Sequence, residues 1–130
     1  MKKIEVVAAI INHKNKILCV QRNINKYDYI SKKYEFPGGK IEYKETHIQA
    51  LKREIIEELC MEIDVTKHFL TVDHKYPDFQ LIMHSYICKC ELDLIRLNEH
   101  INYKWLSKYE LGNLDWAAAD IPIVEKLENE

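Results

Sequence analysis

The sequence is poor in the residues that interrupt regular structure, and it has no long apolar run. Its 130 residues include only three glycines and three prolines, with no repeat, linker or low-complexity segment. The longest apolar run, residues 6–11, is too short to cross a membrane or to form the core of a signal peptide. We therefore expect one domain over residues 1–130, a cytoplasmic location and no membrane partner.

The cysteines and histidines lack the spacings of zinc and redox motifs. Cys19, Cys60, Cys88 and Cys90 form neither a CxxC pair nor a zinc-finger pattern, which predicts reduced and mostly buried thiols. Cys88 and Cys90 alternate on a predicted strand, so they should share a face. The six histidines form no HExxH or similar spacing, which argues against a zinc site.

An excess of positive charge is also absent. Lysine and arginine number 19 against 21 aspartates and glutamates, a net charge of −2. This balance excludes a general basic surface, so we expect no polymeric nucleic acid as partner. Free nucleotides remain possible partners at this net charge, because they need only a local basic site. Hydrophobic residues at 47% and charged residues at 31% are typical of a soluble globular protein.

The hydropathy pattern predicts strands and helices in an order typical of an α/β fold. Strands are expected at residues 4–11, 17–21, 34–36, 68–75, 80–92 and 103–106, with a last helix at residues 120–127. Asp120 and Pro122 fit the N-cap and first turn of that last helix. This order of elements favours a mixed β-sheet covered by helices.

The chain is organised around residues 38–61. Gly38 and Gly39 follow a Phe-Pro pair and predict a tight turn. Beyond it, Thr46 and Gln49 have the spacing of a capping box, which begins a helix over residues 46–59. The apolar face predicted for this helix consists of Ile48, Leu51, Ile55 and Leu59.

Three glutamates of this helix, Glu54, Glu57 and Glu58, stand at i, i+3 and i+4 and therefore adjoin. One interpretation is a solvated helix face, the usual role of charged helix residues. Solvated faces tend to alternate in sign, however, and each like-charged pair costs an isolated helix roughly 0.2–0.5 kcal/mol. A divalent cation would relieve the repulsion, and magnesium favours carboxylate and phosphate oxygens. On spacing alone, both interpretations stay open.

The same stretch resembles the Nudix box, written G-x5-E-x7-R-E-U-x-E-E-x-G-U with U apolar. The positions in register are Gly39, Glu45, Arg53, Glu54, Ile55, Glu57, Glu58 and Met61. Cys60 departs from the pattern, because it stands where the box has glycine. The flanking residues 35–42 resemble the MutT branch of this family in particular.

The resemblance implies the Nudix α/β/α sandwich, a mixed β-sheet flanked by helices, and a site for Mg²⁺, with Mn²⁺ as the alternative. It implies that Glu54 is the general base and that Arg53 orients the glutamates, although sequence alone does not separate base from ligand among Glu54, Glu57 and Glu58. The metal ligands that it implies are Gly38, Glu54, Glu57, Glu58 and Glu99. For Glu99, a loop surface charge is the alternative.

The substrate side of the site follows from the same resemblance. Arg22 and Lys40 are candidates for the phosphates, with a solvated charge as the alternative for each. Asp120 would read the edge of the base, unless it is only a helix cap. Trp116 or Phe36 would stack on the base, and Phe79 would line the same pocket or lie in the core.

The reaction implied is hydrolysis of a nucleoside triphosphate to the monophosphate and pyrophosphate by a monomer or homodimer. The leading substrate is 8-oxo-dGTP, in a role of cleaning the nucleotide pool. A (d)CTP pyrophosphohydrolase of the same branch is the alternative. A Nudix-fold nucleotide-binding module without catalysis is a third interpretation, and the presence of all three box glutamates argues against it.

Overall fold

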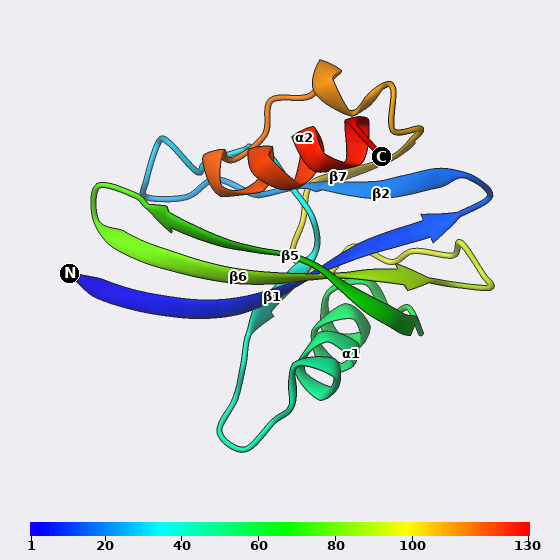
Figure 1. Cartoon of the computed structure of the whole chain (residues 1–130), viewed down its shortest axis with the longest axis horizontal. Coiled ribbons are helices and arrows are strands. Elements are labelled where there is room, and N and C mark those ends of the chain that lie inside the picture. The colour runs from blue at the N-terminus through cyan, green and yellow to red at the C-terminus, as the bar shows by residue number, and fades with distance from the viewer.

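A computed structural model describes residues 1–130 as a mixed β-sheet with one α-helix against each face (Figure 1). The two helices are α1 (His47–Leu59) and α2 (Ile121–Glu128), with short 3-10 turns at Leu111–Asn113 and Ala118–Asp120. The strands are β1 (Lys2–His13), β2 (Lys16–Gln21), β3 (Tyr34–Glu35), β4 (Gly38–Lys40), β5 (Asp64–Lys75), β6 (Phe79–Lys89) and β7 (Asn102–Leu106). Neither helix has the length and apolar character that crossing a membrane requires.

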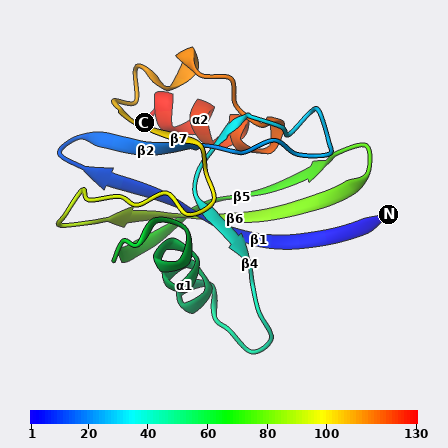
Figure 2. The ribbon, with the colours of Figure 1, turned by 180° about the vertical axis from the view of Figure 1, so that it is seen from behind.

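The sheet is mixed because β1 and β6 run parallel while all other neighbours are antiparallel. Its order is β3-β2-β1-β6-β5, with β4 added to β1 and β7 added to β2. Two strands, β4 and β2, therefore pair with successive parts of the same edge of β1. Its middle pairs with β4 and its last residues pair with β2, as the view from behind makes clear (Figure 2).

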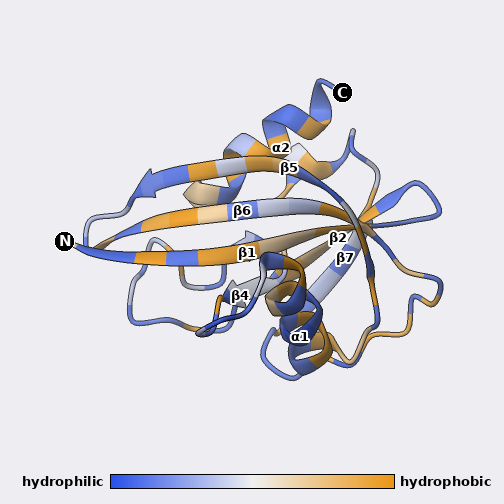
Figure 3. Ribbon diagram, turned by 60° about the horizontal axis from the view of Figure 1, so that its bottom comes forward, coloured by the Kyte–Doolittle hydropathy of each residue, from blue (hydrophilic) through white to orange (hydrophobic).

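Alternate residues of β1 enter two separate cores. Val7, Ala9 and Ile11 pack with α1, whereas Ala8 and Ile10 face α2 on the other side of the sheet. All five are buried, so the central strand is apolar on both faces, and hydrophobic colours prevail along the inner part of β1 in Figure 3. This two-sided burial explains why residues 6–11 form a continuous apolar run.

The predicted order of elements is confirmed, with three corrections. The Gly-Gly stretch is not a turn but the short strand β4, which pairs with β1. β5 already begins at Asp64, four residues before the strand expected at residues 68–75. Ile48 is 45% exposed, because the buried face of α1 is formed by Ala50, Leu51, Ile55, Glu58 and Leu59.

α1 begins and ends as its sequence predicts. Thr46 and Gln49 form the capping box, with the Thr46 hydroxyl accepting from the Gln49 N–H and the Gln49 side chain accepting from the Thr46 N–H. The helix ends at Cys60, whose φ of 55° and ψ of 37° are left-handed. This conformation costs a residue with a Cβ atom roughly 1–2 kcal/mol relative to glycine. Cys60 is also exposed, whereas Cys19, Cys88 and Cys90 are buried.

Replacing Cys60 by glycine should stabilise the protein. We expect Cys60→Gly to raise the free energy of unfolding by about 1 kcal/mol, because glycine adopts the left-handed conformation without the Cβ contact. In a domain of this size that change raises Tm by about 4 °C. Cys60→Ala is the matched control, since it removes the sulfur but keeps the Cβ atom. A Tm for Cys60→Gly at or below that of Cys60→Ala would show that the left-handed residue is not under strain.

Candidate active site

The glycines of β4 allow α1 to lie directly against the sheet. A Cβ atom on Gly38 would lie 1.9 Å from the carbonyl oxygen of Val7 in β1. A Cβ atom on Gly39 would lie 2.4 Å from the carboxyl group of Glu54. Both distances are far inside van der Waals contact, although neither glycine has a positive φ. These glycines are therefore needed for close approach, which brings the carboxylates of α1 onto the backbone of β4.

Arg53 holds several of these carboxylates in place. Its Nε and Nη2 donate to the two oxygens of Glu45 at 2.6 and 2.8 Å, and its Nη1 donates to Glu54 at 2.9 Å and to Glu57 at 3.3 Å. Nη2 also donates to the carbonyl of Lys40 at 3.0 Å, which ties the helix to the end of β4. The hydrogen bonds from Arg53 lower the pKa of Glu45 to about 2. Glu45 is thus an anchor for the arginine.

Glu58 is the most buried of the three helix glutamates, with 5% of its surface exposed. The Gly38 N–H donates to its Oε1 at 3.3 Å. Burial raises the pKa of Glu58 to about 9, and the charges of Glu35, Glu54 and Glu99 add to the rise. Burial also raises the pKa of Glu54. The carboxylates therefore converge at a point where their negative charge is poorly compensated.

The donor set fits a hard divalent cation. Carboxylates from α1 and from Glu99 face one pocket, together with the backbone of Gly38 and Gly39. Magnesium and manganese take oxygen ligands of this kind. Arg53 forms ion pairs with Glu45, Glu54 and Glu57 but not with Glu58, which has no cationic partner. Glu57 is more accessible than Glu54 and Glu58, with 54% of its side chain exposed.

Glu58→Gln should stabilise the metal-free protein, and more strongly as pH rises. The pKa of Glu58 rises from an ordinary 4.5 to about 9 on folding, so between these values the folded chain holds a proton that the unfolded chain releases. The stability of the native protein therefore falls with rising pH over this window, whereas glutamine stays neutral. In EDTA we expect similar Tm values for the two proteins at about pH 5 and a Tm higher by at least about 4 °C for the variant at about pH 8. The exposed Glu62→Gln is the control, and equal pH slopes for all three proteins would contradict the burial of an ionisable group at Glu58.

The pocket beside the carboxylates has a volume of about 820 Å³ and contains most of the predicted substrate residues. Arg22, Lys40, Phe36, Phe79 and Asp120 all line it, and so does Glu99. Apolar side chains from the α2 face of the sheet, among them Leu81 and Met83, complete the wall. One cavity therefore combines a carboxylate cluster, cationic side chains and an apolar region with aromatic side chains.

Asp120 is a pocket residue and does not cap α2 with its side chain. Its Oδ1 accepts instead from the Phe36 N–H at 3.0 Å, and the side chain is almost fully buried. Burial, assisted by the charge of Glu35, raises the pKa of Asp120 well above its ordinary value. Burial therefore favours the neutral form of the group, and one of its oxygens is engaged by Phe36.

Trp116 lies in the core and does not line the pocket. Its indole N–H donates to the Leu111 carbonyl at 2.7 Å, and its ring stacks on Phe36 at a centroid distance of 4.7 Å. Of the two aromatic residues proposed to stack on a base, only Phe36 is therefore available to the cavity. Trp116 supports the Phe36 ring from behind.

Sequence reasoning missed Glu35 and His100 as pocket residues. Glu35 accepts from Arg22 at 3.2 Å and from His100 at 2.9 Å, so it fixes the arginine proposed for phosphate binding. The Nδ1 atom of His100 is buried and has no hydrogen-bond partner. Both residues stood beside predicted ones, since Glu35 precedes Phe36 and His100 follows Glu99. Their pairing joins segments far apart in the sequence, which no local pattern reveals.

Comparisons with known proteins agree with this geometry. A family model described as a NUDIX domain matches residues 6–126. A CTP pyrophosphohydrolase of Escherichia coli K12 is 35% identical over 125 residues, covering 96% of this chain and 91% of the relative. An 8-oxo-dGTP diphosphatase of the same organism is 30% identical over 128 residues, covering 98% of each. The solution structure of a MutT protein from methicillin-resistant Staphylococcus aureus 252 is 42% identical with a TM-score of 0.74, covering 98% of this chain and 97% of that one.

Proposed function

The chain belongs to the Nudix family of hydrolases, and we propose that it is a Mg²⁺-dependent enzyme that converts a nucleoside triphosphate to the monophosphate and pyrophosphate. The observation that carries this proposal is the convergence of Glu54 and Glu58 on the backbone of Gly39 and Gly38, with Glu57 lining the same pocket. A nucleotide-binding module without catalysis would have no use for these poorly compensated carboxylates. As part of the same proposal, the partners of the protein are small nucleotides and its location is the cytoplasm.

Each residue around the pocket has a distinct task in such a reaction. Gly38, Glu54, Glu57, Glu58 and Glu99 would hold Mg²⁺, or Mn²⁺ in its place, and the bound ion would neutralise phosphate charge and acidify water. We assign Glu54 as the general base, because burial raises its pKa and Arg53 fixes one of its oxygens.

The bond changes follow from the proposed products. The oxygen of a water molecule bonds to phosphorus, the P–O bond between the α and β phosphates breaks, and the water proton passes to Glu54. Arg22, fixed by Glu35, and Lys40 would bind the phosphates. Arg53 acts through the glutamates, because its donors are occupied by Glu45, Glu54, Glu57 and the Lys40 carbonyl.

Two base classes fit the proposal, and we put 8-oxo-dGTP first. The relative named 8-oxo-dGTP diphosphatase spans nearly the whole chain, and the carboxyl group of Asp120 beside Phe36 can accept from a purine edge and can donate to it in the neutral form that burial favours. The second candidate is (d)CTP, which the identity of 35% to the CTP pyrophosphohydrolase favours. The donor and acceptor edge of cytosine could be read by the same group.

A panel of triphosphates tests the proposal directly. Pyrophosphate release is measured for 8-oxo-dGTP, dGTP, dCTP and CTP with Mg²⁺, with Mn²⁺ and with EDTA. We expect metal-dependent release, the highest kcat/KM for 8-oxo-dGTP, and no turnover in EDTA. Higher kcat/KM for the cytidine nucleotides would assign the second candidate, and binding without release of pyrophosphate from any member would overturn the enzymatic function.

On this panel, Asp120→Asn should change the order of preference among bases. Asparagine keeps the shape and can still accept from the Phe36 N–H, so Tm should change little. It adds two N–H donors where the carboxyl group has at most one O–H donor, and leaving a buried polar group unpaired costs about 1–3 kcal/mol. We therefore expect the ratio of kcat/KM between purine and pyrimidine substrates to change by about tenfold or more. An equal change for all substrates would place base recognition elsewhere.

A further inference from the structure

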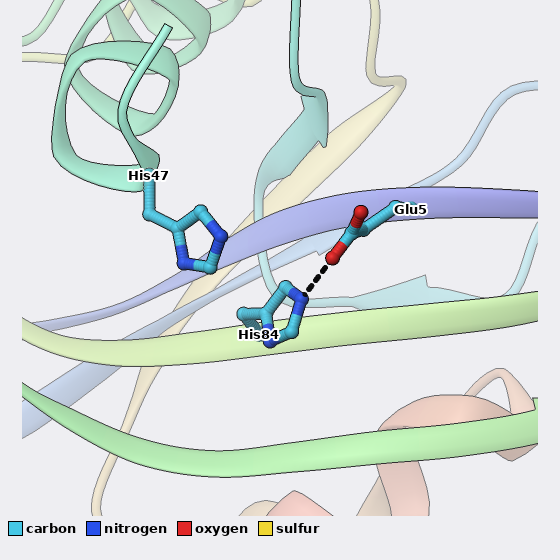
Figure 4. A group of neighbouring side chains, drawn as sticks. All are labelled: Glu5, His47 and His84. Carbon is cyan, nitrogen blue, oxygen red and sulfur yellow. Dashed lines mark hydrogen bonds and ion pairs between the residues drawn. The ribbon is translucent and has the colours of Figure 1, made fainter.

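Outside the active site, three potential metal ligands meet on the surface of the sheet. Glu5, His47 and His84 each present a ligand atom, and these atoms all lie within 4.8 Å of one another. The three side chains converge from β1, from the first residue of α1 and from β6 (Figure 4). His84 Nε2 lies 2.6 Å from Glu5 Oε2, and the two imidazole rings stack at a centroid distance of 4.4 Å.

This cluster is separate from the carboxylate site. None of its three residues lines the pocket. The neighbour of His84 in β6, Met83, does line it and faces α2. His84 alternates with Met83 along β6 and therefore faces the opposite side, where Tyr86 packs against the α1 core. His47 lies two helical turns before Glu54, about 10 Å along the axis of α1.

Both histidines are oriented as metal-ligating histidines usually are. His47 Nδ1 lies 2.7 Å from the Tyr86 hydroxyl, and His84 Nδ1 lies 2.9 Å from the Thr71 hydroxyl, which lies 2.8 Å from His68. A hydrogen bond at Nδ1 fixes the ring and its tautomer, and it directs the lone pair of Nε2 to a metal. For both rings Nδ1 is thus engaged by a side-chain hydroxyl, whereas His84 Nε2 donates to the carboxylate of Glu5, and a metal ion would take the place of the proton in that hydrogen bond.

We propose that Glu5, His47 and His84 form a zinc site. Two imidazole nitrogens and one carboxylate oxygen suit zinc, while magnesium prefers oxygen alone. Three protein ligands leave a fourth position for water. The absence of an HExxH spacing is no obstacle, because the ligands come from three elements that only the fold brings together.

Such an ion would fasten the beginning of the α1 helix to the sheet. His47 is the first residue of α1, while Glu5 and His84 belong to the parallel pair of strands β1 and β6. Zinc binds the folded chain, in which the three ligands are together, better than the unfolded chain. It should therefore raise Tm in a concentration-dependent way.

Calorimetric titration of zinc into the magnesium-saturated protein tests the proposal, since magnesium then occupies the carboxylate site. We expect one zinc per chain, with affinity lowered more than about 100-fold in His47→Ala and in His84→Ala. Tyr86→Phe removes only the partner of His47 Nδ1 and should lower affinity by about 10–100-fold, the usual effect of losing an outer hydrogen bond. His13→Gln and Cys60→Ser are matched controls that should bind zinc as the native protein does.

Two further readouts keep the result independent of the enzymatic function. Zinc should raise the Tm of the native protein and of His13→Gln but not that of His84→Ala, and pyrophosphate release with magnesium alone should be unchanged by His84→Ala. Zinc binding of native strength in both His47→Ala and His84→Ala would overturn the site. Loss of zinc binding in Glu57→Gln, with retention in His84→Ala, would place the ion in the active site instead and would equally overturn it.

Discussion

Glu57→Gln should lower kcat by at least about 100-fold while the protein stays folded. Removal of the carboxylate would take a charged ligand from the proposed metal site, and a catalytic group of this kind contributes about 10²–10⁴-fold to the rate. Glu57 is more than half exposed, and its contact with Arg53 is long at 3.3 Å, so the free energy of unfolding should change by less than about 0.5 kcal/mol. The measurement is kcat across a range of magnesium concentrations, with Tm recorded in parallel.

The control for this substitution is Glu62→Gln, which neutralises an exposed glutamate that does not line the pocket. It should leave kcat and its magnesium dependence unchanged. If Glu57→Gln reaches the native kcat at saturating magnesium, Glu57 is not needed in the metal site.

Arg53→Lys should lower kcat by about 10–100-fold, although it conserves the charge. A lysine places one point charge where the guanidinium donates to Glu45, Glu54 and Glu57 and to the Lys40 carbonyl at once. Loss of that fork leaves Glu54 without a fixed orientation, and groups that position metal ligands change activity by about this factor. Since Arg53 is half-buried, we also expect a loss of stability of about 1–2 kcal/mol.

The division between kcat and KM distinguishes positioning from substrate contact. If Arg53 acts through the glutamates, kcat falls and KM stays close to the native value. A rise of KM with native kcat would instead mean that Arg53 binds the substrate. Lys52→Arg, on the exposed side of the same helix, is the control and should alter neither constant.

The sequence predicts the glutamate helix well because its determinants are local. Thr46 and Gln49 cap it, its apolar period defines the buried side, and the left-handed Cys60 ends it. β4 was missed because adjacent glycines are typical of turns, whereas here they are required by close contact with Val7 and Glu54. The exposure of Ile48 follows from the tilt of the buried face toward Ala50 and Glu58.

For the site, the sequence predicts single residues near recognisable segments but not the residues with which they pair. Arg22 and Asp120 were found through their positions beside recognisable segments, but their partners Glu35 and Phe36 lie on other elements. The resemblance of its segment to MutT-like proteins makes Trp116 or Phe36 the stacking residue, and the structure has Trp116 in the core behind Phe36. The convergence of His47 with His84 depends on packing of α1 against β6, which no spacing in the sequence encodes.

The parallel pairing of β1 with β6 also bears on how the chain folds during synthesis. β1 leaves the ribosome well before β6, yet Lys2 pairs with Phe79 and Asn12 pairs with Lys89, so the longest partner of β1 is made more than 60 residues later. β5 and β6 join through a tight turn and can pair as soon as they emerge, whereas closing the long loop to β1 is entropically costly and slow. The apolar residues 6–11 are thus exposed on the nascent chain for most of translation, and this strand is where chaperones or self-association would act first.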